Sequence, residues 1–139
     1  MIGIDTSILV YALDPTCPEH ADAAKTFLAS KNWAVNSTVV HECYHTLVFK
    51  RKMTPNDSRL KIVGFLKDSR TTFLNLNKTV SMLALELATK MNLGGRDSII
   101  ISSYIHKHIP EIYSHDEELT GLSEVKFKGR HVSITDPIK

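Results

Sequence analysis

The chain has 139 residues, of which 42% are hydrophobic, and it carries a formal net charge of only +2. This length and apolar content fit a single globular domain over residues 1–139, while so small a charge does not by itself predict a nucleic-acid partner. The sequence has no run of about 18 apolar residues, which excludes a membrane-spanning helix, and its N-terminus lacks the basic segment of a signal peptide. Cys17 and Cys43 lie far apart, so we expect two reduced thiols in a cytoplasmic protein.

The first part of the chain alternates short apolar runs with stretches of helical periodicity. Residues 2–4 predict a strand, and a helix is expected to begin at Pro18, with apolar side chains at positions 21, 24, 27 and 28. Residues 33–35 predict a second strand. Ser37 is then expected to cap a helix whose apolar face reaches Val48.

The remainder of the chain continues this alternation. It predicts, in chain order, a helix from Thr54-Pro55, a strand over residues 73–76, a helix over residues 80–91 that Gly94-Gly95 ends, a helix over residues 97–108, and strands over residues 112–114 and 132–134. Short apolar strands between amphipathic helices indicate an α/β fold with a buried, mostly parallel sheet of four to five strands. Ligands of such sheets bind beyond the carboxyl ends of the strands.

Four acidic residues lie close to the ends of these elements. Asp5 directly follows the first strand and Asp116 closely follows the fourth, so both are expected at the carboxyl edge of the sheet. Glu42 lies early in the helix that begins at the same edge. The position of Asp97 stays open, because two helices precede the fourth strand and antiparallel packing would place the start of the second at the opposite edge. Each acid also has a purely structural alternative, as a helix cap or a surface charge.

A group of carboxylates at one edge favours a bound cation. Like charges raise the pKa of at least one carboxyl group unless a cation joins them, and a charge on Asp5, beside a strand buried on both faces, needs a partner. Hard oxygen ligands suit Mg²⁺ or Mn²⁺. Such an ion can activate a water and neutralise the charge of a phosphodiester, so we hypothesise metal-dependent phosphodiester chemistry with Asp5 as the central ligand.

Residues 41–45 read HECYH, which matches the zinc motif in which a helix offers two imidazoles to the metal and a glutamate to the water. A zinc peptidase needs a third protein ligand. The chain has Val48 and Arg51 where the extended motif requires glycine and histidine, and no glutamate occurs between residues 42 and 86. A zinc metallopeptidase is therefore the less favoured alternative, and we interpret His41 and His45 as surface or partner-contact residues.

Four segments together resemble the PIN-domain ribonucleases, and in particular the VapC-type toxins of prokaryotic toxin–antitoxin pairs. These segments are IGIDTSILVYALDP, STVVHECYHTL, GRDSIIISSYI and YSHDEEL. The resemblance maps the four catalytic, metal-binding acids of the family onto Asp5, Glu42, Asp97 and Asp116, which resolves the position of Asp97. It also implies hydroxyl residues beside the acids, at Thr6 or Ser7 and at Ser114, although many of the toxins carry asparagine at the position of Ser7.

The resemblance implies a three-layer α/β/α sandwich and an Mg²⁺- or Mn²⁺-dependent endoribonuclease that cleaves RNA with a metal-activated water. A toxin of this kind is expected to bind a small antitoxin protein and to form a homodimer. Two alternatives remain, a PIN protein that processes RNA without being a toxin and an RNA-binding module that does not cut.

Basic residues provide candidates for phosphate contacts, on charge alone. These are Arg96 and the cluster Lys50, Arg51 and Lys52. A second cluster, formed by Lys126, Lys128 and Arg130, is interpreted as solvated surface charge. The remaining acids of interest, Asp14, Glu117 and Asp136, are interpreted as structural or peripheral.

Overall fold

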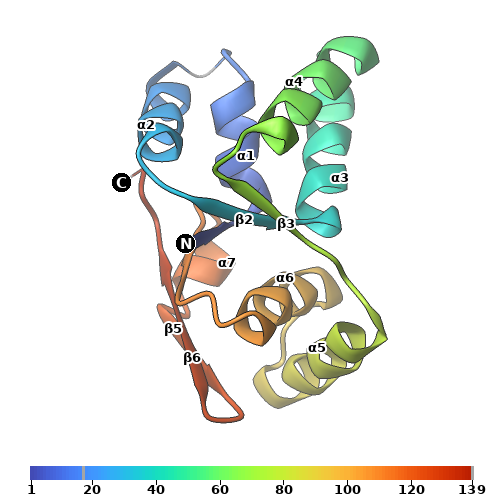
Figure 1. Ribbon diagram of the computed structural model, residues 1–139, viewed down its shortest axis with the longest axis vertical. Coiled ribbons are helices and arrows are strands. Elements are labelled where there is room, and N and C mark those ends of the chain that lie inside the picture. The colour runs from blue at the N-terminus through green and yellow to red at the C-terminus, as the bar shows by residue number, and fades with distance from the viewer. Residues whose placement is uncertain (17, 139) are drawn as a thin grey trace.

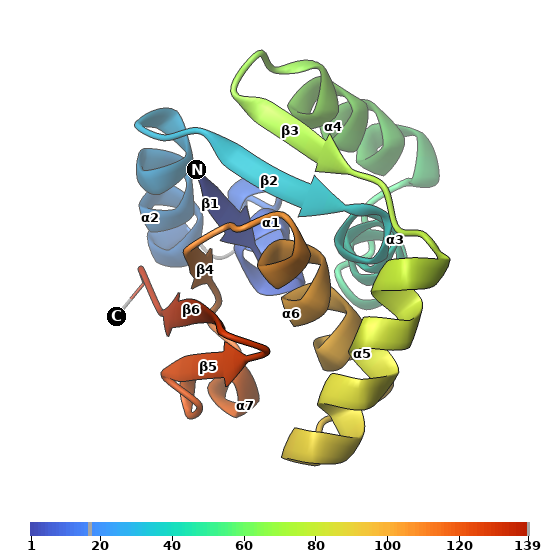
Figure 2. The ribbon, with the colours of Figure 1, turned by 60° about the horizontal axis from the view of Figure 1, so that its bottom comes forward.

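The computed structural model describes residues 1–16 and 18–138, apart from the side chain of Phe27. Within these residues, six strands form one sheet in the order β3-β2-β1-β4-β6-β5 (Figure 2). Their bounds are Ile2–Ile4 (β1), Trp33–Asn36 (β2), Thr71–Leu74 (β3), Glu111–Tyr113 (β4), Glu124–Phe127 (β5) and Arg130–Thr135 (β6). Neighbouring strands are parallel except for the antiparallel pair β5 and β6. The predicted α/β fold with a mostly parallel sheet is confirmed.

Helices cover both faces of the sheet and produce the three expected layers. One face is covered by α1 (Thr6–Leu13), α2 (Pro18–Ala29), α3 (Ser37–His45) and α4 (Pro55–Lys67), as Figure 1 shows. The opposite face is covered by α5 (Lys78–Met91) and α6 (Gly95–His106), while α7 (Glu117–Thr120) is a short helix that follows β4. Because both faces are covered, β1 and β2 are buried along their whole length.

The predicted helix from Ser37 begins and ends differently from expectation. Asn36 is the cap, because its side-chain oxygen accepts a hydrogen bond from the backbone N–H of Val39 at 3.1 Å. The α-helix ends at His45 and continues into a π-helical turn, η1 (Thr46–Lys50). π-Helical turns are frequent at functional sites.

Three further boundaries are shifted. Helix α5 ends at Met91, because the left-handed φ of 54° at its C-cap Asn92 terminates it before the predicted Gly94-Gly95. Gly94 instead precedes the first turn of α6, so the helix predicted over residues 97–108 begins two residues earlier and ends at His106. The strand predicted over residues 73–76 lies over residues 71–74, where it pairs with β2.

Sequence reasoning misses two elements. Helix α1 follows Asp5 at once and is so apolar that its buried side chains, among them Ile8 and Leu9, conceal the helical period. Strand β5 forms a hairpin with β6 and raises the number of strands above the predicted four to five. The turn between them contains Lys128 and Gly129, whose φ angles of 52° and 75° are those of a type I′ hairpin turn.

The cysteine prediction holds for the residue that the structure describes. Cys43 is a free thiol in the core, where burial raises its pKa to about 12 and keeps it neutral. Cys17 lies outside the described residues, as does the side chain of Phe27, which was predicted to lie on the apolar face of α2. No helix in the described part of the chain combines the length and the apolar character that crossing a bilayer requires.

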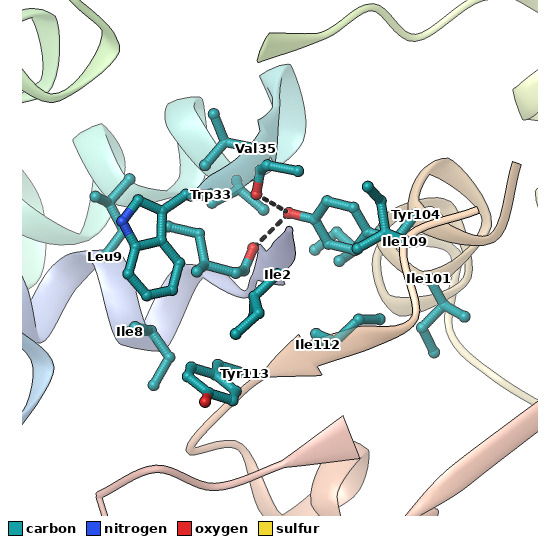
Figure 3. Close-up of a cluster of buried hydrophobic side chains, with 14 of the residues drawn as sticks. Ile2, Ile8, Leu9, Trp33, Val35, Ile101, Tyr104, Ile109, Ile112 and Tyr113 are labelled. Carbon is teal, nitrogen blue, oxygen red and sulfur yellow. Dashed lines mark hydrogen bonds between the residues drawn. The ribbon is translucent and has the colours of Figure 1, made fainter. Parts of the chain in front are cut away.

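A buried tyrosine joins the last residue of β1 to the middle of β2. The Tyr104 hydroxyl lies 2.5 Å from the backbone oxygen of Ile4 and 3.1 Å from that of Ala34, so it bridges β1 and β2 from α6 (Figure 3). The ring packs directly against Gly3, where an added Cβ would lie 2.7 Å from the ring carbons. Gly3 therefore allows the tyrosine to approach the strand that ends at Asp5.

We predict that Gly3→Ala destabilises the protein by about 1–3 kcal/mol, because the added methyl group overpacks a rigid aromatic ring. Urea unfolding followed by circular dichroism measures the change. Gly64→Ala is the matched control, since this glycine lies in α4 with nothing within 4 Å of an added Cβ, and helix propensity favours alanine there. An unfolding midpoint for Gly3→Ala equal to that of the unaltered protein would contradict this packing.

Candidate functional site

The fold brings the four predicted carboxylates to the carboxyl edge of the sheet. Asp5 follows β1 and Asp116 follows β4, which is the parallel neighbour of β1. Glu42 lies in the second turn of α3, and Asp97 lies in the first turn of α6. Helix α6 leads directly into the start of β4, so it runs against the strands and begins at their carboxyl edge (Figure 2). The direction of α6 places Asp97 at the carboxyl edge, which the order of the predicted elements alone left open.

The guanidinium of Arg96 lies at the centre of these acids. Its Nε is 2.6 Å and 2.5 Å from the two carboxylate oxygens of Glu42, and its Nη2 is 2.9 Å from Oδ1 of Asp5. Its Nη1 donates to Oδ1 of Asp97 and lies 3.9 Å from Oδ2 of Asp116. The sequence predicted Arg96 as a phosphate contact only; in the structure it is the shared counter-ion of all four carboxylates. These charges raise the pKa of Arg96 despite the opposing effect of its partial burial.

Asp5 is the most buried member of the group, with no exposed surface. Burial raises the pKa of its carboxyl group above the ordinary range. Three contacts oppose this shift, namely Arg96, the hydroxyl of Ser114 at 2.7 Å and the backbone N–H of Thr6 at 2.8 Å. The last bond also caps α1, so Asp5 is both the helix cap and a member of the acidic group.

The hydroxyl residues hold the carboxylates in place. Oγ1 of Thr6 donates to Glu42 at 2.7 Å, and Oγ of Ser114 donates to Asp5 while accepting the backbone N–H of Asp116 at 3.0 Å. Ser7 acts elsewhere, because its Oγ accepts the backbone N–H of His115 at 3.0 Å. Of the three expected hydroxyls, two therefore contact the acids and one holds the loop that carries Asp116.

An open cleft of about 280 Å³ lies over this edge. It is lined by Asp5, Thr6, Ser7, Val10, Tyr11, Glu42, Thr46, Lys50, Arg51, Arg96 and Asp116. Three of the four predicted basic residues line it, and the fourth, Lys52, does not. Sequence reasoning missed Tyr11, although Ser7, Tyr11 and Asp14 recur at helical spacing and would mark a polar face once α1 is recognised.

The histidines of HECYH lie apart from the cleft. His41 lines a separate apolar groove with Tyr44 and Phe73, and the ring of His45 lies 5.0 Å from that of Phe49. Of the motif, Glu42 alone belongs to the acidic group, and neither imidazole lines the cleft that contains it.

The donor set fits a hard divalent cation in its chemistry. All four side chains are carboxylates, which Mg²⁺ and Mn²⁺ prefer, and all four approach a single positive group. With the guanidinium between them, no three histidine, cysteine, aspartate or glutamate side chains of the described residues form a ready metal site. A metal ion bound there would therefore replace the guanidinium as the cation between the four carboxylates. The side chain of Arg96 would have to move away from them.

The fold and this edge define a class of α/β protein in which a parallel sheet carries an acidic site at the carboxyl ends of its strands. The PIN domain family model matches residues 2–128. The chain therefore belongs to the PIN domain family. This membership leaves the zinc metallopeptidase alternative without support.

Solved structures share this fold at low sequence identity. VapC20 of Mycobacterium tuberculosis, a toxin that cleaves the Sarcin-Ricin loop, superimposes with a TM-score of 0.75 at 16% identity, over 94% of this chain and 99% of its own. VapBC2 of Rickettsia felis, bound to a promoter DNA fragment, gives a TM-score of 0.68 at 17% identity, over 98% of both chains. A toxin–antitoxin complex of Klebsiella pneumoniae gives 0.66 at 17% identity, over 99% of this chain and 98% of its own. A search of curated protein sequences finds no significant match.

We predict that Arg96→Gln lowers the stability of the metal-free protein at neutral pH by about 1–3 kcal/mol, because buried Asp5 loses its cation while Arg96 itself is one-third exposed. Urea unfolding in the presence of EDTA measures the loss. Arg70→Gln is the control, because its partner Asp68 is 34% exposed whereas Asp5 is fully buried, so this ion pair should contribute less. Equal losses for the two variants would rule out a special role for Arg96 in balancing the acids.

Proposed function

We propose that this protein is a metal-dependent endoribonuclease that hydrolyses RNA phosphodiester bonds. The observation that carries the proposal is the convergence of four carboxylates, one of them fully buried, on a single cation at the carboxyl edge of a PIN fold. Such a concentration of negative charge repels RNA unless a cation neutralises it. On this proposal, the site binds polyanionic RNA when a divalent metal ion neutralises the negative charge of its carboxylates.

Asp5, Glu42, Asp97 and Asp116 would hold the ion, and Mg²⁺ or Mn²⁺ is the expected cofactor. When bound, the ion supplies a water of lowered pKa and positive charge at the phosphodiester. The protein supplies rigidity, because Asp5 is fixed by a strand end and a helix cap while Thr6 and Ser114 orient its neighbours. Catalytic groups held by such contacts need little reorganisation during the reaction.

Arg96 would exchange its partners when the ion binds. Its guanidinium lines the cleft, and its hydrogen bonds within the described residues all go to carboxylates that would bind the ion. Released from them, it would remain beside the site with its donors available to the substrate phosphate, which a guanidinium can bind through two parallel hydrogen bonds. This proposed exchange of partners agrees with the role of phosphate contact that the amino-acid sequence predicted for Arg96.

The biological role that we propose is that of the toxin of a toxin–antitoxin pair. The support comes from the fold, since VapC20, VapBC2 and the Klebsiella complex are toxins or toxin–antitoxin assemblies. On this proposal the chain binds a small antitoxin protein and forms a homodimer. A PIN protein of RNA processing is the alternative, and it would share the chemistry without the effect on growth.

We expect purified protein to cleave a labelled RNA in Mn²⁺ or Mg²⁺ and not in EDTA. Asp5→Asn and Asp116→Asn should each abolish most of the cleavage, because each removes a charge that the ion needs. Glu117→Gln is the matched control, since this exposed acid lies beside Asp116 without belonging to the group. Cleavage that persists in EDTA, or in Asp5→Asn with its fold intact, would refute the metal-dependent mechanism.

Expression of the chain in a bacterial host tests the toxin assignment separately. We expect the unaltered protein to arrest growth and Asp116→Asn, produced at the same level, to leave growth unchanged. Asparagine caps helices as well as aspartate does, so this variant keeps the hydrogen bond that begins α7. Normal growth with an active nuclease present would favour the RNA-processing alternative.

A further inference from the structure

We propose that Asp14, Arg51 and Tyr11 form a preorganised binding site for a second phosphate of the RNA strand, next to the four carboxylates. The inference rests on the proposed ribonuclease function and specifies how that site holds its substrate. Asp14, interpreted from the sequence as structural or peripheral, becomes the residue that positions Arg51.

The location of Arg51 is the first argument. Arg51 follows η1, and its backbone N–H closes the π-helical turn on the carbonyl oxygen of Thr46 at 2.9 Å. Its side chain lines the same cleft as Asp5 and Glu42, together with Tyr11 of α1. The turn thus continues α3 beyond Glu42 and brings a cation to the wall of the acidic cleft.

The second argument is the manner in which Arg51 is held. The side chain of Asp14 is only 1% exposed and accepts three hydrogen bonds, from the backbone N–H and the hydroxyl of Thr16 at 3.0 Å and 2.9 Å and from Nη1 of Arg51 at 3.0 Å. Cζ of Arg51 also lies 5.4 Å from the centre of the Tyr11 ring, within cation–π range. The guanidinium is therefore fixed from two sides before any ligand arrives.

The third argument is what remains available on Arg51. The side chain is 28% exposed, and its Nε and Nη2 have no hydrogen-bond partner among the described residues. A planar guanidinium that is anchored through one nitrogen and open at the others suits a phosphate, which it can bind through two parallel bonds. Lys50 lines the same wall and adds charge of the same sign.

A simpler explanation is that Arg51 only neutralises the buried carboxylate of Asp14. Removing Arg51 alone cannot separate the two, because it would leave a buried, unpaired charge and lower the stability as well. The double variant Asp14→Asn/Arg51→Ala removes both charges. It should recover stability lost in Arg51→Ala while leaving the phosphate site empty.

RNA affinity is measured by fluorescence anisotropy with a short fluorescein-labelled single-stranded RNA in Mg²⁺, over a series of KCl concentrations. All variants are made in the Asp116→Asn background to prevent cleavage, and the intact length of the RNA is checked on a gel. Stability is measured on the same samples by urea unfolding. Arg59→Ala in α4 is the matched control, since among the described residues its side chain bonds to exposed Asn56 alone, and it does not line the acidic cleft.

We expect Arg51→Ala and the double variant to bind the RNA at least about tenfold more weakly, with the slope of log affinity against log salt reduced by about 1. Arg59→Ala should change neither quantity. Recovery of RNA affinity together with stability in the double variant would overturn the phosphate site and leave the ribonuclease proposal intact. A folded, unaltered protein that neither binds nor cleaves the RNA in Mg²⁺ at any salt concentration would overturn both.

Discussion

The buried carboxylate of Asp5 is the constraint on which the site depends. It lies at the end of a strand that both layers of helices cover, where an unpaired charge is unfavourable. The chain satisfies it with one serine, one backbone N–H and one guanidinium. Arg96 then collects the other three acids around the same point. A single positive charge thus organises four negative ones that come from four different parts of the chain.

This arrangement links the stability of the fold to the chemistry of the site. The same carboxylates that need Arg96 in the metal-free protein are those that a divalent ion would need. Metal binding would therefore replace one cation by another of higher charge, and the balance between the two would depend on the freedom of the Arg96 side chain. Because that side chain is one-third exposed, it has room to leave the acids without disturbing the core.

The geometry at Asp5 in turn depends on packing behind the strand. Tyr104 reaches from α6 to the last residue of β1 and to β2, and Gly3 leaves the space for its ring. Helix α6 also carries Arg96 and Asp97 in its first turn. Helix α6 therefore contacts the end of β1 through Tyr104 and also places Arg96 and Asp97 at the carboxyl edge of the sheet. These two roles of one helix couple the packing of the core to the geometry of the site.

The sequence by itself determined the alternation of strands and helices, because burial on a parallel sheet leaves a strong apolar pattern. It also predicted three of the acids, two that follow strands and one early in the helix after β2. It concealed α1, whose faces are too apolar for a visible period, and it misplaced the caps of α3 and α5 by one or two residues, since several nearby residues can serve as caps. The tertiary structure alone decided the direction of α6, the central position of Arg96 and the pairing of Asp14 with Arg51. These contacts join residues 37 and 91 positions apart, and only the folded chain determines which distant charges meet.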